Sequence, residues 1–231
     1  MTALQDLLIV GAGGFARETA EAVRAINERK PLWRLLGYVD DDPGLAGRVI
    51  DGIQIVGPLK TIREYPSAAL VVCVGHPGNY FSRKRIVQSL SLPESRYATI
   101  MHPSVSWPAT SPIGPGSVLL ASVVGTAAVT IGAHVTVMPG AIFTHDDVVE
   151  DFTTFGAGAR LAGRVHVGQG AYVGSGVLVR EDRRIGAWSL VGMGAVVTRD
   201  VPDGEIWMGT PARFHRRVEV PSDVLETASM P

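Results

Sequence analysis

The sequence predicts an α/β N-terminal domain that is half-Rossmann-like, followed by an all-β left-handed parallel β-helix of hexapeptide repeats. Two observations predict this fold class. Large apolar residues recur every six positions from Met101 to Val197, and residues 7–39 read as a strand, a glycine turn, a helix and a second strand. We place the first domain at residues 1–97, the β-helix at 98–218 and a flexible tail at 219–231.

The six-residue period is the strongest signal in the chain. Seventeen hexads fit between Met101 and Pro202 without a break in phase, and among their first positions from Ile113 onward only Gly125 is not a large apolar residue. A period of six fits neither an α-helix nor a simple strand, but it is typical of short flat strands joined by tight corners. Three hexads make one triangular coil, so residues eighteen apart are expected to stack on adjacent coils.

The other hexad positions have preferences of their own. The second is often glycine, which we interpret as a source of backbone freedom, and the fifth is usually small or β-branched, which fits the narrow space beside a corner. The repeat therefore explains its own Ile, Val, Gly and Ala residues as parts of a shape. Function is expected in polar residues that the shape does not need, and His145-Asp146-Asp147 is the densest such cluster.

Composition excludes several classes of protein. The 231 residues carry a formal net charge of −1 and no run of like charges, so neither nucleic acid nor a membrane surface is an expected partner. The first residues lack the basic and apolar regions of a signal peptide, and no apolar run is long enough to span a membrane, so we expect a cytoplasmic protein. The single Cys73 excludes an intrachain disulfide, and its apolar neighbours predict a small buried side chain.

The N-terminal residues have the order of a nucleotide-binding βαβ unit. The apolar run Leu7–Val10 leads into the turn Gly11–Ala16, which satisfies the G-x-G-x-x-G/A form, and a helical stretch follows. A second strand ends in Asp40 and Asp41, roughly where an acidic residue meets a ribose hydroxyl in such folds; a solvated turn is the competing interpretation. Strands are also expected at 53–56 and 69–74, the latter ending at Gly75, with a helix at 81–87. The domain is too short for six strands, which weakens a dehydrogenase interpretation.

His145 is the histidine expected to carry chemistry. His134, His145 and His166 lie 11 and 21 residues apart, so they do not stack around one metal ion as a γ-type carbonic anhydrase requires, and we expect no metal. Asp146 can orient the His145 imidazole, and Gly163 lies one coil above it, at about 4.8 Å, with an accessible N–H. A general base beside an oxyanion donor is what acyl transfer needs.

These residues resemble one family, the bacterial hexapeptide-repeat sugar acyltransferases of the sialic acid O-acetyltransferase type, which includes N-acetyltransferases acting on nucleotide-linked 4-amino-4,6-dideoxy sugars. The resemblance covers nearly the whole chain. Its marks are Gly11–Ala16, Val39–Asp41, Val74–His76, His145–Asp146, Phe155–Gly163 and Gly209–Arg213.

The resemblance implies a homotrimer with acetyl-CoA lying along the prism at the subunit interface. His145 matches the general base, Asp146 the acidic residue that raises its basicity, and Gly163 the amide that binds the acetyl oxygen. Thr154 and Ser175 match positions that line the coenzyme, although Thr154 replaces a histidine of some members. The positions that match acceptor-binding residues are Gly13, Gly14, Phe15, Asp40, Asp41 and Gly75.

We therefore expect an acetyl-CoA-dependent acetyltransferase that acts on an amino group of a nucleotide-activated amino-dideoxy sugar. Phe15 and His76 stand where some members place a histidine and an asparagine, which leaves the acceptor open. The alternatives are O-acetylation, or acylation of a free sugar, an amino acid or an amino-sugar antibiotic intermediate. A trimeric nucleotide-binding scaffold without catalysis is an alternative of another class.

Overall fold

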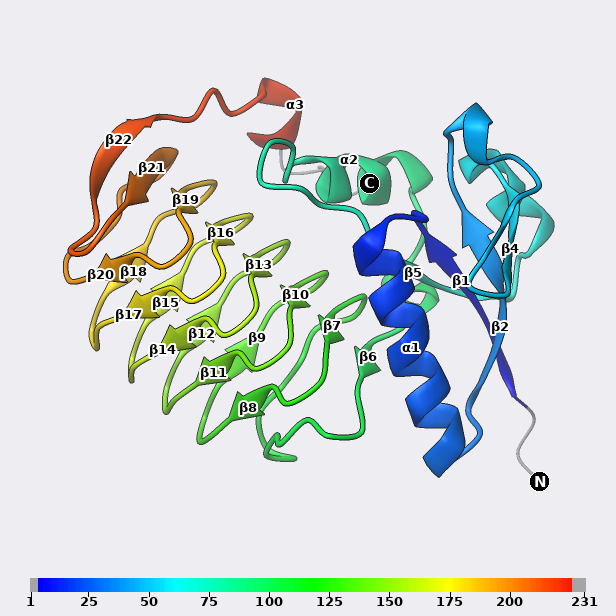
Figure 1. The fold of residues 1–231 in the computed structure, drawn as a ribbon, viewed down its shortest axis with the longest axis horizontal. Coiled ribbons are helices and arrows are strands. Elements are labelled where there is room, and N and C mark those ends of the chain that lie inside the picture. The colour runs from blue at the N-terminus through cyan, green and yellow to red at the C-terminus, as the bar shows by residue number, and fades with distance from the viewer. Residues whose placement is uncertain (1–3, 226–231) are drawn as a thin grey trace.

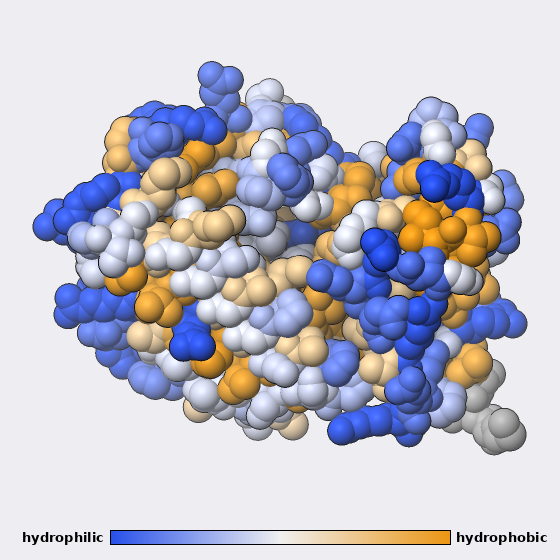
Figure 2. Space-filling model, in the orientation of Figure 1, coloured by the Kyte–Doolittle hydropathy of each residue, from blue (hydrophilic) through white to orange (hydrophobic). Residues whose placement is uncertain are grey.

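The computed structural model describes residues 4–225. Figure 1 shows an N-terminal sheet with its helices beside a prism whose coils advance away from that sheet. The chain then returns along the prism, so that its last described residues lie against a helix of the N-terminal part. Figure 2 shows the surface hollowed between the two parts. No helix among the described residues is both long enough and apolar enough to cross a membrane.

The N-terminal part is a five-stranded, mostly parallel sheet. Its strands are β1 (Gln5–Val10), β2 (Trp33–Val39), β3 (Val49–Ile50), β4 (Ile53–Gly57) and β5 (Ala69–Val72), in the order β3-β4-β2-β1-β5. Only β3 and β4 are antiparallel. The helices are α1 (Gly14–Arg29) and α2 (Ser82–Leu90), with 3-10 turns η1 (Pro43–Leu45), η2 (Leu59–Glu64) and η3 (Glu94–Arg96). The four predicted strands and both predicted helices are therefore confirmed.

The glycine turn after β1 is held tightly against the end of β5. Gly11 has a φ of +101°, and an added Cβ would lie 2.8 Å from the carbonyl oxygen of Cys73, so no other residue fits. Cys73 itself is 2 % exposed, and its thiol donates a hydrogen bond to the Thr19 hydroxyl at 3.3 Å. Burial raises the pKa of this thiol to about 12, and the low exposure confirms the prediction of a small buried side chain.

The prism is the predicted left-handed β-helix. Its strands are β6 (Ile100–Met101), β7 (Val118–Leu119), β8 (Val124–Gly125), β9 (Thr130–Ile131), β10 (Thr136–Val137), β11 (Ile142–Phe143), β12 (Val148–Val149), β13 (Thr154–Phe155), β14 (Arg160–Leu161), β15 (His166–Val167), β16 (Tyr172–Val173), β17 (Leu178–Val179), β18 (Arg184–Ile185), β19 (Leu190–Val191) and β20 (Val196–Val197). They form three parallel faces. The first face contains β6, β7, β10, β13, β16 and β19, the second β8, β11, β14, β17 and β20, and the third β9, β12, β15 and β18.

Each prism strand pairs with the strand eighteen residues further along, as the repeat predicts. Val137, for example, pairs with Leu119 and Phe155. The one exception among the first hexad positions, Gly125, is explained by packing: an added Cβ would lie 2.5 Å from the ring of Trp107. The ring of Trp107, which belongs to the preceding coil, also packs edge-on against Phe143 at 5.9 Å. It therefore fills the core space that a large side chain at position 125 would need.

The interpretation of the second-position glycines is wrong. These glycines do not have a positive φ; they are needed because the next coil is close, as at Gly132, where an added Cβ would lie 2.7 Å from the amide nitrogen of Asp151. The left-handed backbone conformation belongs to the fourth position of the hexad, where the chain turns each corner. The residues that adopt it are Gly116, Ser122, Ala128, His134, Gly140, Asp146, Phe152, Gly158, Arg164, Gly170, Gly176, Asp182, Trp188 and Gly194.

A buried arginine joins the two parts of the molecule. Arg83 of α2 is 2 % exposed and donates to the Thr136 hydroxyl at 2.7 Å, the Phe152 carbonyl at 2.7 Å and the Thr154 hydroxyl at 2.8 Å. No carboxylate among residues 4–225 pairs with it. Burial lowers the pKa of its guanidinium to about 10. Arg83 therefore fixes α2 to the first face of the prism through hydrogen bonds alone.

The C-terminal segment packs on the last coil of the prism and on α2. Strands β21 (Glu205–Met208) and β22 (Arg213–Arg217) form an antiparallel hairpin on the last coil, and helix α3 (Ser222–Leu225) lies against α2. Lys84 donates to the carbonyl of Val224 at 2.5 Å, and Val224 is 0 % exposed. Part of the segment predicted as a flexible tail, residues 222–225, therefore packs on α2 through one buried apolar side chain and a lysine that binds its backbone. Residues 226–231 lie outside the described residues.

Candidate active site

His145 lies on the corner between the second and third faces of the prism. The corner joins β11 to β12, and the Nδ1 of His145 lies 2.8 Å from the Oδ2 of Asp146. The two side chains are 51 % and 56 % exposed. When Nδ1 carries the hydrogen and donates it to the carboxylate, Nε2 has the free lone pair. The pair therefore presents an oriented base at an open corner.

Gly163 occupies the same corner one coil further along, between β14 and β15. A Cβ added to Gly163 would lie 2.4 Å from the Nε2 of His145, so the imidazole rests against this glycine. The N–H of Gly163 donates to no acceptor within residues 4–225. An unpaired amide and the lone pair of a base are thus adjacent, which is the arrangement that addition to a carbonyl group requires.

A second concave site surrounds the glycine turn of the N-terminal part. This cavity of about 250 Å³ contains five of the six positions predicted to bind the acceptor: Gly13, Gly14, Phe15, Asp40 and Gly75. Helix α1 begins here with no acidic residue in its first turn and no side-chain cap at Gly13. A Cβ added to Gly13 or Gly14 would meet nothing within 4 Å, so the space beside the start of the helix is open. The helix dipole and these donors favour an anion.

The two predicted aspartates contact backbone amides at the edge of this site. Asp40 accepts from the amide of Ala12 at 2.9 Å, which ties the end of β2 to the glycine turn. Asp41 accepts from the amide of Leu59 at 2.7 Å and lines an adjoining cavity of about 140 Å³ with Asp40 and Ile86. Asp41 is therefore next to the glycine-turn cavity and outside its lining.

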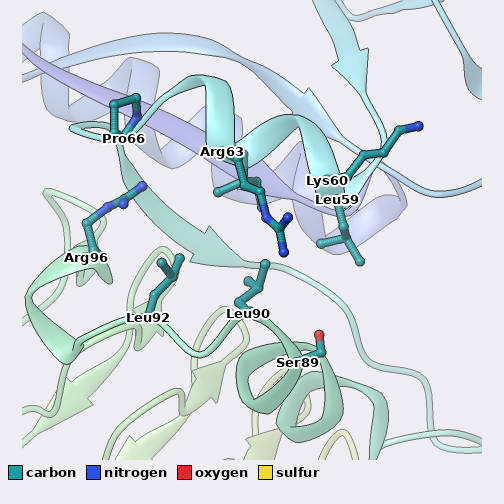
Figure 3. Close-up of a pocket in the computed structure, with 9 residues that line it drawn as sticks. Leu59, Lys60, Arg63, Pro66, Ser89, Leu90, Leu92 and Arg96 are labelled. Atoms are coloured by element: carbon teal, nitrogen blue, oxygen red, sulfur yellow. The ribbon is translucent and has the colours of Figure 1, made fainter.

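A larger cavity lies elsewhere. It measures about 420 Å³, and its lining includes residues of η2 and the end of α2, such as Arg63 and Leu90. Figure 3 shows Arg63 directed toward Leu90 and Lys60 directed away from the cavity. The cavity contains no residue that the sequence singled out, and it shares only Leu59 with the cavity beside Asp41.

Comparison with known proteins identifies the family. Residues 6–90 match the PglD N-terminal domain. The chain is 30 % identical over 221 residues to the GDP-perosamine N-acetyltransferase of Escherichia coli O157:H7, which covers 90 % of this chain and 96 % of that protein. The chain belongs to the PglD-like hexapeptide-repeat acetyltransferases. This membership confirms the predicted acetyl-CoA-dependent acyltransferase.

Solved structures agree with this assignment over most of the chain. The acetyltransferase domain of PglB from Neisseria gonorrhoeae, in complex with acetyl coenzyme A, matches with a TM-score of 0.82 and 25 % identity over 92 % of this chain and 100 % of that one. A histidine mutant of perosamine N-acetyltransferase from Caulobacter crescentus, in complex with CoA and GDP-perosamine, matches with a TM-score of 0.81 and 29 % identity over 92 % and 98 %.

The two other residues predicted to line the coenzyme are not brought to His145 within one chain of this PglD-like acetyltransferase. Thr154 lies in β13 on the first face, is 8 % exposed, and its hydroxyl accepts from Arg83. Ser175 lies on the corner between β16 and β17, which joins the first and second faces. Thr154 therefore contacts α2, and Ser175 faces solvent on a different corner.

Two further histidines of the prism, His134 and His166, have structural surroundings. His134 stacks on Phe152 at 5.1 Å, and burial followed by the charge of Arg83 lowers its pKa to about 4. His166 lies 2.7 Å from Glu150 on the third face. Within residues 4–225 no three histidine, cysteine or acidic side chains are grouped as metal ligands.

Two buried charged residues received no role from the sequence, although one of them, Asp147, belongs to the polar cluster His145–Asp147 in which function was expected. Arg83 could not be recognised, because its partners lie far away along the chain. Asp147 carried a usable signal, since it is a charged residue at a fifth hexad position, where the prism places small or β-branched side chains. It is 0 % exposed; burial raises its pKa to about 7 against the opposing effect of hydrogen bonds from the Val165 and Thr144 amides.

Replacing Gly163 by alanine should displace the His145 ring. The added Cβ would overlap Nε2, and a shift of about 1 Å in a catalytic group lowers kcat by roughly 10²-fold. Steady-state kinetics with a parallel thermal melt measure this effect. We expect an unchanged Tm, because the half-exposed His145 can swing into solvent; unchanged kcat would show that the ring position is unimportant.

Proposed function

We propose that this protein transfers the acetyl group of acetyl-CoA to an amino group of a nucleotide-linked amino-dideoxy sugar. The observation that carries the proposal is the contact between the Nε2 edge of His145 and Gly163, whose N–H has no acceptor in the described chain. A separate glycine turn at the N-terminus of α1 offers an anion site. The related proteins solved in complex with CoA and GDP-perosamine support the choice of these two classes of substrate.

The chemistry follows from the positions of these groups. Asp146 accepts the Nδ1 hydrogen of His145, so Nε2 removes a proton from the acceptor amine as its nitrogen attacks the thioester carbonyl. The N–H of Gly163 stabilises the oxyanion that develops. The carbon–sulfur bond then breaks, the amide remains on the sugar, and the CoA thiolate takes the proton from His145.

We further propose that the enzyme is a homotrimer. Gly163 and Ser175 lie on two different corners of one prism, so a coenzyme that runs along a corner meets both only where two copies pack together. The 51 % exposure of the His145 side chain in one chain also fits a site completed by a neighbour. Acetyl-CoA and nucleotide sugars are cytoplasmic metabolites, and we place the enzyme there.

The acceptor subsite is assigned to the cavity at the glycine turn. The diphosphate of a nucleotide sugar suits the free N–H groups at Gly13 and Gly14, with Phe15 and Gly75 beside it. Asp40 and Asp41 mark the side on which the nucleoside lies. Thr154, which binds Arg83, is left out of the coenzyme site of its own chain.

The test supplies acetyl-CoA together with GDP-perosamine, a uridine-diphosphate 4-amino sugar, a free amino sugar and an amino acid. Release of the CoA thiol is followed, and each product is analysed by mass spectrometry with and without hydroxylamine, which cleaves esters and leaves amides. We expect a hydroxylamine-resistant product from a nucleotide-linked amino sugar. Turnover of only a free acceptor would contradict the proposal, and acetyl-CoA binding without any turnover would favour the scaffold.

A further inference from the structure

The hydrogen-bond ladder of the prism is interrupted at the residue before His145. From Gly114 to Arg180, the amide at the second position of each hexad donates to the carbonyl of the residue seventeen positions further along the chain, with one exception. The exception is Thr144, whose N–H donates instead to Oδ2 of Asp147 at 2.9 Å. Accordingly β11 pairs with β14 only at Ile142, whereas the other neighbouring pairs of prism strands join two residues each.

This interruption leaves polar groups without partners at the catalytic corner. The carbonyl of Leu161 accepts no hydrogen bond from residues 4–225, and the hydroxyl of Thr144 is buried without a partner there. The adjacent coils are regular: Thr126 donates to Phe143 at 3.1 Å and Ala162 to Val179 at 3.0 Å. Departures from hydrogen-bond satisfaction in a native fold call for an explanation, and this one adjoins the base.

Asp147 is the side chain that replaces the ladder bond. Its other oxygen, Oδ1, accepts from the amide of Val165 at 2.8 Å, one coil further along. Thr144 directly precedes His145, and Val165 lies two residues after Gly163. One carboxylate therefore binds the backbone on both sides of the gap between the base and the open amide. The ionisable groups whose charges act on it are His145 and Asp146.

We propose that Asp147 is a positioning residue for acetyl transfer, whose buried carboxylate holds the corner that carries His145 against the corner that carries Gly163. The inference rests on the proposed function, in which His145 is the base. Asp147 does not touch the reacting atoms. It sets the position of the base through the amides of Thr144 and Val165.

The fold alone does not require a carboxylate at this position. In the same column of the prism, one coil before and one coil after, the fifth hexad positions are Val129 and Val165, and both are buried. Burying a carboxylate carries a desolvation cost, and replacing a buried charged group by an apolar one of similar volume is often neutral or stabilising. Asp147 is thus better explained by the geometry of the site than by stability.

The experiment compares Asp147→Val and Asp147→Asn with the wild type. Valine matches the neighbouring coils, and asparagine keeps the shape but has only one oxygen to accept from two amides. We expect kcat to fall by roughly 10- to 100-fold in both, with the KM for acetyl-CoA and the Tm near wild type. The matched control is Ser117→Val, since the Ser117 hydroxyl accepts from the Val135 amide at 2.9 Å in the same way, but on the corner between the third and first faces. Its kcat should stay unchanged.

Wild-type kcat in either folded Asp147 variant overturns the proposal. So does a fall in kcat that follows a fall in Tm, or loss of folded protein in both variants, because Asp147 would then serve the fold alone. His145→Asn is measured alongside. Undiminished turnover in that variant overturns the proposed function and the Asp147 proposal with it, whereas lost turnover in His145→Asn with normal kcat in Asp147→Val overturns only the positioning role.

Discussion

His145→Ala is expected to lower kcat by roughly 10²- to 10⁴-fold while the protein stays folded. The imidazole lies against Gly163, and its Nδ1 is already held by Asp146 at 2.8 Å. Without it, an amine acceptor attacks the thioester with no group in place to remove its proton. Stopped-flow or steady-state detection of CoA release measures kcat, and size-exclusion chromatography reports the assembly.

The same prism offers a matched control for this prediction. His166 is also half-exposed and also has a carboxylate partner, Glu150, at 2.7 Å. One coil above His166, however, Arg184 stands in place of a glycine, so no open amide adjoins that imidazole. We expect His166→Ala to retain wild-type kcat. Near-normal turnover in His145→Ala would contradict the mechanism, and an equal loss in both variants would point to a general effect on the prism.

The stacking of Gly163 on His145 could be predicted from the sequence because the signal is local and periodic. Apolar first positions recur at a period of six, so a register of eighteen residues placed Gly163 above His145 without any long-range information. The structure has the two residues in close contact, as this register predicts: a Cβ added to Gly163 would lie 2.4 Å from the Nε2 of His145.

The backbone of the corners could not be predicted in the same way. Residues as different as Ala128, Arg164 and Trp188 adopt the left-handed conformation at the fourth hexad position, so residue type carries no signal there. The second-position glycines were wrongly interpreted as a source of backbone freedom, because a positive φ and a close neighbouring backbone both select glycine. Only coordinates distinguish them.

Contacts between segments that lie far apart in the chain could not be predicted either. Helix α3 is a single turn with one fully buried side chain, Val224, and its position depends on Lys84, which lies far back in the chain. Arg83 likewise reads as part of a basic helix face, yet it is buried among hydroxyls and carbonyls of the prism. Propensity and periodicity describe an element and its faces, but they do not say what will cover those faces.

Arg83→Met is expected to lower the free energy of unfolding by about 3 kcal/mol, since each buried acceptor left without its hydrogen bond costs about 1–3 kcal/mol and relief of the buried charge offsets part of this loss. The acceptors left behind include the carbonyls of Phe152 and Thr153 and the hydroxyl of Thr154. Chemical denaturation measures the change.

The neighbouring Arg85 provides the control for the Arg83 prediction. It lies on the same helix, but it is exposed and pairs with Asp223 at 2.7 Å, so Arg85→Met should cost much less stability than Arg83→Met. Arg83→Lys should fall between the two, because one ammonium group cannot reach acceptors in both parts of the molecule.

Since α2 also borders the glycine-turn cavity through Ser82, loosening this helix in Arg83→Met should raise the KM for the nucleotide sugar more than the KM for acetyl-CoA. Equal stability of the Arg83→Met and Arg85→Met variants would show that the first face of the prism and the N-terminal sheet are held together by their apolar contacts, and that the buried guanidinium adds nothing to them.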